Sequence, residues 1–503
     1  MLIKWSQASV KARSLVLAIW LALTVFGLFG ASHLDKYLTT SLVVPGSSSA
    51  TANEILNEKF KENTEGTFTV MYKYKQASTL EIEGFKESLR KAATSIPGSE
   101  ITQEKAFAGT LYASIGTPFD LKGAAKYSEN FRAALKAEGL TGALVSGPPA
   151  IESDVVPILS SDLHRGQLIA VVLAALLLIA TLGFSWAVII PLIFGLATIS
   201  TTLGIIYLLA HKFLMVLYVP NIVELIGLGL AIDYSLLMVS RYRHELEHST
   251  NPLTETMRSA GRTAVISGAT VALGLSTLLL VPVPFVKSLG LACLILPLVS
   301  IAAAVTLQPI LLLALAKPNN SKFKGLLNLS FDGLINVAIK RPRVVLASSL
   351  TVVALLMSAL MWIQVTPSSL SAIPSNLESA QALNTVTSKV GVGVITPSEI
   401  VVDLGPNATA QDLADVRFEF VKRIAADKEV FTVANGEKWP YVDSTGRYLR
   451  IYVFGNHDLG SSETRKLVSD LRNIYIPEAG FPKDSKFYLG GAPAQGIEDR
   501  KST

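Results

Sequence analysis

Seven long apolar stretches constrain this chain more than any other feature of its sequence. A helix needs about 20 mainly apolar residues to cross the hydrocarbon core of a bilayer. The stretches that qualify cover roughly 14–31, 167–183, 187–210, 214–240, 263–281, 288–316 and 344–363. Half of the 503 residues are hydrophobic, and they are concentrated in these runs in a way that no water-soluble core requires. The sequence therefore predicts a polytopic α-helical membrane protein.

Basic residues are distributed unevenly around the expected spans. The flanks 1–13, 241–262 and 317–343 contain thirteen Lys and Arg residues, whereas the short loops on the other side contain only Lys212 and Lys287. By the positive-inside rule this asymmetry places the N-terminus in the cytoplasm. The first span follows a basic segment but has no A-x-A-like cleavage site after it, so we interpret it as an uncleaved signal anchor.

The spans divide the chain into six expected parts. These are span 1 within 1–31, a first extracytoplasmic domain at 32–166, spans 2–6 within 167–316, a cytoplasmic linker at 317–343, span 7 at 344–363 and a second extracytoplasmic domain at 364–503. The linker contains an amphipathic segment, 321–339, which we expect to lie as a helix on the inner leaflet. No outer-membrane element is recognisable, so a bacterial plasma membrane is the expected location.

The two long extracytoplasmic segments carry a repeated pattern of strands and helices. In the first we expect strands at 67–74, 111–115 and 143–146 and helices at 50–60, 80–93 and 120–138. In the second we expect strands at 399–404, 448–454 and 487–489 and helices at 377–390, 409–426 and 461–473. Ser-Gly-Pro-Pro-Ala at 146–150 recurs as Gly-Gly-Ala-Pro-Ala at 490–494. The pattern predicts two α+β domains that arose by duplication.

The net charge of +5 follows from this topology. Each of the two long segments carries a net charge of −2, so the positive surplus lies on the spans and their short flanks. A basic face for nucleic acid is therefore not expected. The one cysteine, Cys293, excludes a disulfide framework or a Cys-based metal cluster, and no Walker-type phosphate loop occurs. We expect no cofactor and no enzymatic activity, and any pumping would draw on an ion gradient.

The ionisable residues inside the expected spans are Glu224 and Asp233, both in the fourth span. A charge in hydrocarbon costs at least ~2.5 kcal/mol and persists only when it is paired, neutralised or hydrated. At a rise of about 1.5 Å per residue, Asp233 lies near mid-membrane, while Glu224 lies close enough to the outer end to reach water. A carboxyl beside the phenol of Tyr234 could hold and pass a proton. We therefore predict a proton relay at Asp233 and Tyr234.

Simpler roles are open for the same residues and their neighbours. Asp233 could be a neutral acid that ties two helices together, and Glu224 could snorkel to the interface rather than form an entrance-side proton site. Gly229 lies one turn before Asp233 on the same helix face. Ser267 and Thr270 in the fifth span could support the relay or simply allow close helix packing.

A competing motif follows the fourth span. His244, Glu245 and His248 match H-E-x-x-H, which on a helix places two imidazoles one turn apart for zinc and a carboxylate beside the metal-bound water. The other four histidines of the chain fall on the opposite side of the expected membrane, so no third histidine is within reach. A charged turn at the end of a span is the simpler interpretation. We expect no metal and keep a membrane zinc metalloprotease as an alternative.

Two segments form a recognisable signature, GLGLAIDYSLLMVSRYR at 227–243 and AGRTAVISG at 260–268. With the layout of one span, one exported domain, five spans and a repeat, they resemble the MMPL family of the resistance-nodulation-division (RND) transporter superfamily. The resemblance covers essentially the whole chain. It implies two ferredoxin-like, porter-type extracytoplasmic domains and proton-driven export of lipids, hydrophobic compounds or drugs, with Asp233 and Tyr234 matching the relay pair. Membrane lipids, a hydrophobic or lipid substrate and protons are the partners it implies.

The chain departs from that family in length. The resemblance implies twelve spans and a second Asp-Tyr pair in the tenth, whereas this sequence carries seven spans, so we expect it to be C-terminally truncated with spans 8–12 missing. A shortened reading frame, a half-transporter completed by a second chain, and a non-transporting binding or assembly partner are all open explanations. No cluster of residues names the substrate.

Overall fold

The computed structural model describes residues 2–39, 46–74, 79–107, 109–281, 283–316, 337–360, 374–390, 393 and 396–501. The chain divides into two units. The membrane unit comprises Met1–Thr40 and Ser161–Gln364, and the α+β unit comprises Ser41–Ser160 and Val365–Thr503. Most of the amphipathic helix expected at 321–339 lies outside the described residues.

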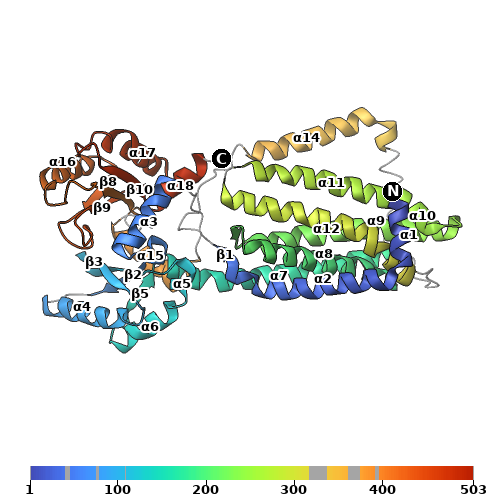
Figure 1. Cartoon of the computed structure of the whole chain (residues 1–503), viewed down its shortest axis with the longest axis horizontal. Coiled ribbons are helices and arrows are strands. Elements are labelled where there is room, and N and C mark those ends of the chain that lie inside the picture. Colours follow the sequence, from blue (N-terminus) through green and yellow to red (C-terminus); the bar gives the residue numbers. More distant parts are fainter. Residues whose placement is uncertain are drawn as a thin grey trace. The chain divides into compact units, whose positions relative to one another are not determined.

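Six helices are long and apolar enough to cross a membrane, counted over the described residues. Their helical segments run alongside one another (Figure 1) and are α2 (Arg13–Leu34), α7 (Pro148–Leu182), α8 (Ile189–Ala210), α9 (Val219–His248), α11 (Arg262–Ser276) and α12 (Pro284–Leu315). Short elements complete the unit, namely α1 (Leu2–Lys11), which packs against α12, and α10 (Pro252–Thr256), which leads through a π-helical turn into α11. Helix α14 (Pro342–Leu360) has a shorter apolar stretch, and the expected span at 344–363 ends outside the described residues, so it stays a prediction.

Helices α7 and α9 begin at different residues from those predicted for the second and fourth spans. The expected start of the fourth span, Met215–Val216, is instead strand β6, which pairs in parallel with β1 (Leu38–Thr39). Helix α9 then starts at Val219 with Pro220 in its first turn, where the missing N–H of proline has no helical partner to lose. Helix α7 begins at Pro148, well before the expected residue 167, because proline at a helix start is favourable, and the helix continues through Pro157 to Leu182.

Among the six described spans, the one that contains α8 is the most buried. Of the 18 most apolar consecutive residues in its span, 67% are buried, whereas the corresponding share in the span of α2 is 17%. The inner face of α8 is rich in Gly, Ala, Ser and Thr, which allow helix backbones to approach closely. A Cβ built on Gly27 of α2 would lie 1.9 Å from the carbonyl oxygen of Ser200 on α8. The α2–α8 contact therefore depends on small residues, while large side chains of α2 such as Leu21 point outward.

Each half of the α+β unit has the element order βαββαβ. The first half comprises β2 (Phe68–Lys73), α4 (Thr79–Ala93), β3 (Glu100–Phe107), β4 (Thr110–Gly116), α5 (Leu121–Ala125), α6 (Ser128–Ala137) and β5 (Ala143–Ser146). The second comprises β7 (Ser398–Asp403), α16 (Ala414–Ala425), β8 (Val430–Ala434), β9 (Tyr448–Gly455), α17 (Ser462–Asp470) and β10 (Lys486–Gly490). The strand orders, β3-β4-β2-β5 and β10-β7-β9-β8, are the same ferredoxin-like order, with every pair antiparallel. The predicted fold class, a polytopic helical membrane protein with two α+β domains, is confirmed.

Several boundaries inside these domains differ from the predictions. Strands β3 and β8 were not predicted, and both lie at sheet edges, where the apolar alternation is weak. The helix expected at 120–138 is divided into α5 and α6, with the side chain of Asp120 capping α5 through the N–H of Gly123. The helix expected at 409–426 begins only at Ala414, because Asp412 accepts hydrogen bonds from Thr409 and holds the preceding turn.

The helix that opens each copy packs on the sheet of the other copy. Helix α3 (Ser48–Phe60) buries its apolar face against Val401 of β7, and the Oγ of Ser48 accepts a hydrogen bond of 2.8 Å from the N–H of Leu489. Helix α15 (Glu378–Val390) packs against β5, and the Oγ of Ser146 donates to the carbonyl of Ser379 at 2.9 Å. The two copies therefore exchange helices, and each sheet is covered on one face by its partner copy.

Candidate functional site

Asp233 lies in the middle of α9, fourteen residues after Val219 and fifteen before His248. The preceding apolar sequence has no residue that would break the helix, and Asp233 itself lies on an exposed face of α9. Gly229, one turn earlier, is also exposed, and a Cβ built on it would meet nothing within 4 Å. Among the described residues, this face of α9 is thus exposed, and both roles of Asp233, the proton relay and the tie between two helices, stay predictions.

Tyr234, unlike Asp233, points into the interior of the helix bundle. Its side chain is 5% exposed and belongs to the core of the membrane unit. Its hydroxyl has no hydrogen-bond partner among the described residues, and it lies 3.5 Å from the position that a Cβ on Gly268 of α11 would occupy. A buried phenol without a partner is costly in protein interiors. Two adjacent residues of α9 therefore differ in their surroundings. The carboxyl of Asp233 lies on the outside of the helix bundle, and the phenol of Tyr234, which lacks a hydrogen-bond partner among the described residues, lies inside it.

The fifth-span residues are close to Tyr234 in the chain fold but are not bonded to it. Ser267 and Thr270 flank Gly268 and are both exposed. The Thr270 hydroxyl donates to the carbonyl of Ile266 in its own helix at 2.9 Å. The structure thus places Gly268 of α11 against Tyr234, while the roles of Ser267 and Thr270 stay predictions.

A second polar contact lies one residue further along α9. The Nε2 of Gln308 on α12 donates to the Oγ of Ser235 at 2.9 Å, and both residues are fully buried. The Oε1 of Gln308 has no hydrogen-bond partner among the described residues. We did not single out this pair from the sequence, although a glutamine inside a long apolar run was a usable signal.

Glu224 is held by a neighbouring helix. It accepts a hydrogen bond from the Nε2 of Gln167 on α7, and its side chain is partly buried. This contact is compatible with both roles predicted for Glu224, an acid that snorkels to the interface and an entrance-side proton site. Whether it takes up protons at the entrance of a path stays a prediction.

The H-E-x-x-H pentad forms the last turns of α9 and is engaged in contacts of its own. Glu245 is buried and pairs with Arg241 at 2.6 Å, and the Nδ1 of His248 lies 2.8 Å from the carbonyl oxygen of His244. No group of three or more His, Cys, Asp or Glu residues that could hold a metal ion occurs in the described part of the chain. These contacts favour a charged helix end over a zinc site.

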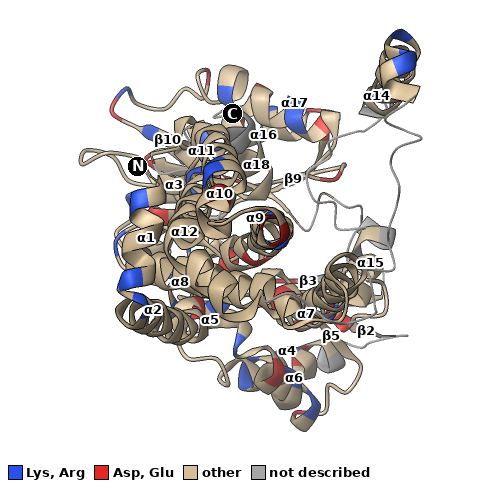
Figure 2. Cartoon of the chain, turned by 90° about the vertical axis from the view of Figure 1, so that its right-hand side faces the viewer, with Lys and Arg blue, Asp and Glu red and all other residues tan. Residues whose placement is uncertain are grey.

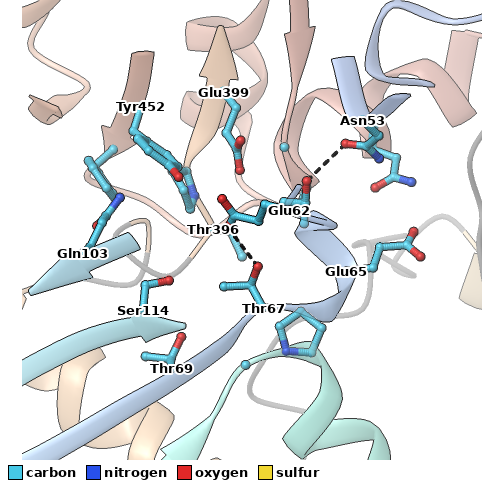
Figure 3. Close-up of a pocket in the computed structure, with 18 of the residues that line it drawn as sticks. Asn53, Glu62, Glu65, Thr67, Thr69, Gln103, Ser114, Thr396, Glu399 and Tyr452 are labelled. Atoms are coloured by element: carbon cyan, nitrogen blue, oxygen red, sulfur yellow. Dashed lines mark hydrogen bonds between the residues drawn. The ribbon is translucent and has the colours of Figure 1, made fainter. Parts of the chain in front are cut away.

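The α+β unit contains a pocket of about 240 Å³ between its two sheets. Figure 3 shows Thr69 and Ser114 of the first domain on one side, Glu399 and Tyr452 of the second on the other, and Glu62 between them. The lining contains hydroxyl, amide and carboxyl groups among apolar side chains. Sequence reasoning did not find this pocket, because its walls come from segments more than 200 residues apart.

Comparisons with known proteins agree with this architecture. Residues 113–325 match the model of the MMPL family. The chain is 33% identical over 181 residues to the membrane protein SCO6666 of Streptomyces coelicolor, covering 35% of this chain and 26% of that protein. It is 27% identical over 336 residues to the trehalose monomycolate exporter MmpL3 of Mycobacterium tuberculosis, covering 62% of this chain and 35% of that protein. The chain thus spans about a third or less of the length of these curated relatives.

A solved structure extends the similarity to the whole fold. The cryo-EM structure of the hedgehog release protein Disp from the water bear Hypsibius dujardini superposes with a TM-score of 0.57 at 10% identity, covering 100% of this chain and 80% of that one. At this identity the likeness concerns the fold alone. The six apolar helices and the similarity to membrane proteins show that the chain is a multi-pass membrane protein, and its residues 113–325 match the MMPL family.

Proposed function

We propose that this chain acts in proton-driven export of a lipid or another hydrophobic compound across a bacterial plasma membrane, as the N-terminal part of a transporter. One observation carries the proposal: the mid-helix carboxyl of Asp233 stands beside Tyr234, whose buried hydroxyl lacks a partner among the described residues. The similarity to a protein named as a trehalose monomycolate exporter supports a lipid-like substrate.

The proposed mechanism begins with the protonation of Asp233. An ionised carboxyl in hydrocarbon must be hydrated or paired, whereas the protonated acid can stay in an apolar contact. Each change of protonation therefore alters what the exposed face of α9 can pack against. Tyr234 transmits the change to α11 because its hydroxyl lies against Gly268. A shift of α9 and α11 would then drive the α+β domains, which move the substrate.

The exposure of Asp233 supports a further membrane partner on this face. A charged or protonatable residue on a lipid-facing surface is unfavourable by at least ~2.5 kcal/mol, and Gly229 beside it leaves room for close helix approach. We propose that another membrane helix covers Gly229 and Asp233 in the working transporter, supplied by further spans or by a second chain. Lipid would contact this face only in the isolated unit.

The proposed orientation places the N-terminus in the cytoplasm. Blue Lys and Arg residues are visible on α1 and next to α10, at one end of the membrane unit (Figure 2). Lys4 and Lys11 belong to α1, and Arg258 and Arg262 follow α10 in the chain. The positive-inside rule assigns such an end to the cytoplasm. The α+β domains are then extracytoplasmic, which suits an exporter that delivers its substrate away from the cell interior.

The test measures proton-coupled flux in vesicles that contain the chain together with the further spans or the second chain that completes the transporter. A pH-sensitive dye inside the vesicles should report proton movement driven by an imposed gradient, and Asp233→Asn should abolish it. Tyr234→Phe, which removes only the hydroxyl, should slow it. Glu247→Gln provides the matched control, since this exposed carboxylate lies on the same helix at its charged end and should leave the flux unchanged.

Two outcomes would contradict the proposal. Proton flux that survives Asp233→Asn at the parent rate would exclude Asp233 as the relay. A binding or assembly role would instead be indicated by two results together. The vesicles would show no proton flux, and the chain would form a stable complex with another membrane protein that also conducts no protons.

A further inference from the structure

A buried arginine lies at the contact between the two α+β domains. Arg450, on strand β9, is 1% exposed. Its neighbours Leu449 and Ile451 belong to the apolar core of the second domain. Because side chains alternate along a strand, Arg450 and Tyr452 point to the opposite face of the sheet, toward the first domain. Both residues line the pocket described above.

Two carboxylates meet this guanidinium, one from each domain. Glu399 on β7 accepts hydrogen bonds from the Nε of Arg450 at 3.1 Å and from its Nη2 at 2.9 Å. Glu62 accepts from Nη1. It lies in the segment that leads into the first sheet, where Thr67 donates to its Oε1 at 3.1 Å. The pair Glu62–Arg450 therefore joins the first domain to the second, whereas Glu399–Arg450 lies within the second.

The charges at this site do not balance. Two carboxylates face one guanidinium, and all three side chains are at most 4% exposed. Burial, with the nearby charge of Glu62, raises the pKa of Glu399 despite the opposing effect of Arg450. Among the other groups nearby, the ring of Tyr452 lies 4.3 Å from the guanidinium carbon, and burial raises the pKa values of Tyr452 and Tyr441.

Among the described residues that line the pocket, Arg450 is the one that carries a positive charge. Glu65 and Tyr112 from the first domain also line it, and burial raises the pKa of Tyr112. The tyrosines are thus neutral around neutral pH. Uptake of one proton by Glu399 leaves Glu62 and Arg450 as a balanced ion pair, whereas its loss leaves a net negative charge buried at the domain contact.

We propose that Glu62, Glu399 and Arg450 form a second proton-binding site, which latches the two α+β domains together when one proton is bound and loosens them when it leaves. Glu399 binds the proton more tightly in the closed contact than in water, so falling pH favours the closed form and rising pH favours the open one. Because the three residues line the pocket, opening of the latch would widen it. This site is independent of Asp233 and does not require that the chain transports anything.

The test measures the distance between the two domains as a function of pH. Spin labels are attached to Lys136→Cys on α6 and Ala425→Cys on α16, two exposed positions, in a Cys293→Ser background of the full chain in detergent. Pulsed EPR should show that the ratio of closed to open molecules falls as pH rises from about 5 to about 8, by up to about tenfold per pH unit for a single linked proton.

Substitutions assign the response to the latch. Glu399→Gln imitates the protonated acid and should keep the domains closed at every pH. Glu62→Gln removes the ion pair between the domains and should raise the open share at every pH. Asp403→Asn is the matched control, because Asp403 lies on the same strand and pairs with Arg447 inside the second domain only. It should keep the parent's pH response, as should Asp233→Asn.

Two results would overturn the latch. One is a parent distance distribution that does not change across this pH range. The other is a Glu399→Gln variant that opens with rising pH as the parent does. Because Glu399→Gln preserves the size of the side chain, it tests the idea even if Glu62→Gln fails to fold, and unchanged far-UV circular dichroism would verify that the domains are intact.

Discussion

Gly27 on α2 and Gly204 on α8 are in backbone contact, since a Cβ built on Gly204 would stand 2.9 Å from the Cα of Gly27. The same position on Gly204 would also lie 3.1 Å from the ring of Phe26. Such contacts let two membrane helices pack over their backbones instead of their side chains. They also make the pair sensitive to the smallest substitutions.

Gly204→Ala should destabilise the membrane unit by about 1–3 kcal/mol, because the added methyl group has no space and the helices must separate. Thermal unfolding in detergent would measure the loss. Gly274→Ala on α11 is the control, since nothing lies within 4 Å of its Cβ position and alanine favours the helix. Equal midpoints for the two variants would show that the α2–α8 contact is not tight.

Gly491→Ala should destabilise the second α+β domain by about 1–3 kcal/mol. Gly491 has a φ of +85°, and its Cβ would lie 2.2 Å from the carbonyl oxygen of Pro397. Gly147 occupies the corresponding place in the first domain with a φ of +95°, so Gly147→Ala should do the same there. Urea unfolding followed by far-UV circular dichroism would measure both. Gly496→Ala, in open space, should cost little, and a comparable loss there would contradict the steric explanation.

The contact between Gln308 and Ser235 should contribute a measurable coupling energy. A double-mutant cycle of Gln308→Met and Ser235→Ala should give about 0.6–1.7 kcal/mol, the range for hydrogen bonds between membrane helices. Unfolding of the four proteins in detergent provides the values. Strictly additive effects would mean that the hydrogen bond adds no stability, with Gln308 acting only through packing.

The Asp403–Arg447 pair should make the stability of the second domain depend on pH. The hydrogen bonds from Arg447 lower the pKa of Asp403 in the folded protein. Its contribution is therefore present above the unfolded pKa of about 3.9 and is lost as pH falls through the lower folded value. The difference in thermal midpoint between the parent and Asp403→Asn should shrink in acid. A constant difference from neutral pH down to about pH 3 would contradict this pairing.

The helices of the membrane unit were largely predictable from the sequence, because crossing a bilayer requires a long apolar run whatever the neighbours are. The βαββαβ order could also be predicted in outline, since central strands such as 448–454 alternate strongly. The edge strands β3 and β8 were missed because half of their hydrogen-bonding groups face no neighbour, and their side chains need not be apolar. Met215–Val216 was assigned to a span because its pairing partner, β1, is far away in sequence.

The candidate sites also have a part that the sequence predicts and a part that depends on the tertiary structure. Asp233 and Tyr234 could be proposed from the sequence, since an acid in an apolar run is unfavourable unless it has a role. Their surroundings could not, because the exposure of Asp233 and the contact of Tyr234 with Gly268 depend on how α9 and α11 pack. Arg450 lies within a predicted strand, yet nothing local indicates that Glu62, 388 residues away, would be its partner.

The sequence by itself determined where the chain enters the membrane and that two similar domains follow the spans, because hydrophobic periodicity is a local property. Only the tertiary structure decided that the copies exchange helices α3 and α15 and that two acids share one arginine. Both features depend on packing between segments that are far apart in the sequence. Such segments match in shape and charge only in the folded protein, and this match produces no periodic pattern of residues along the chain.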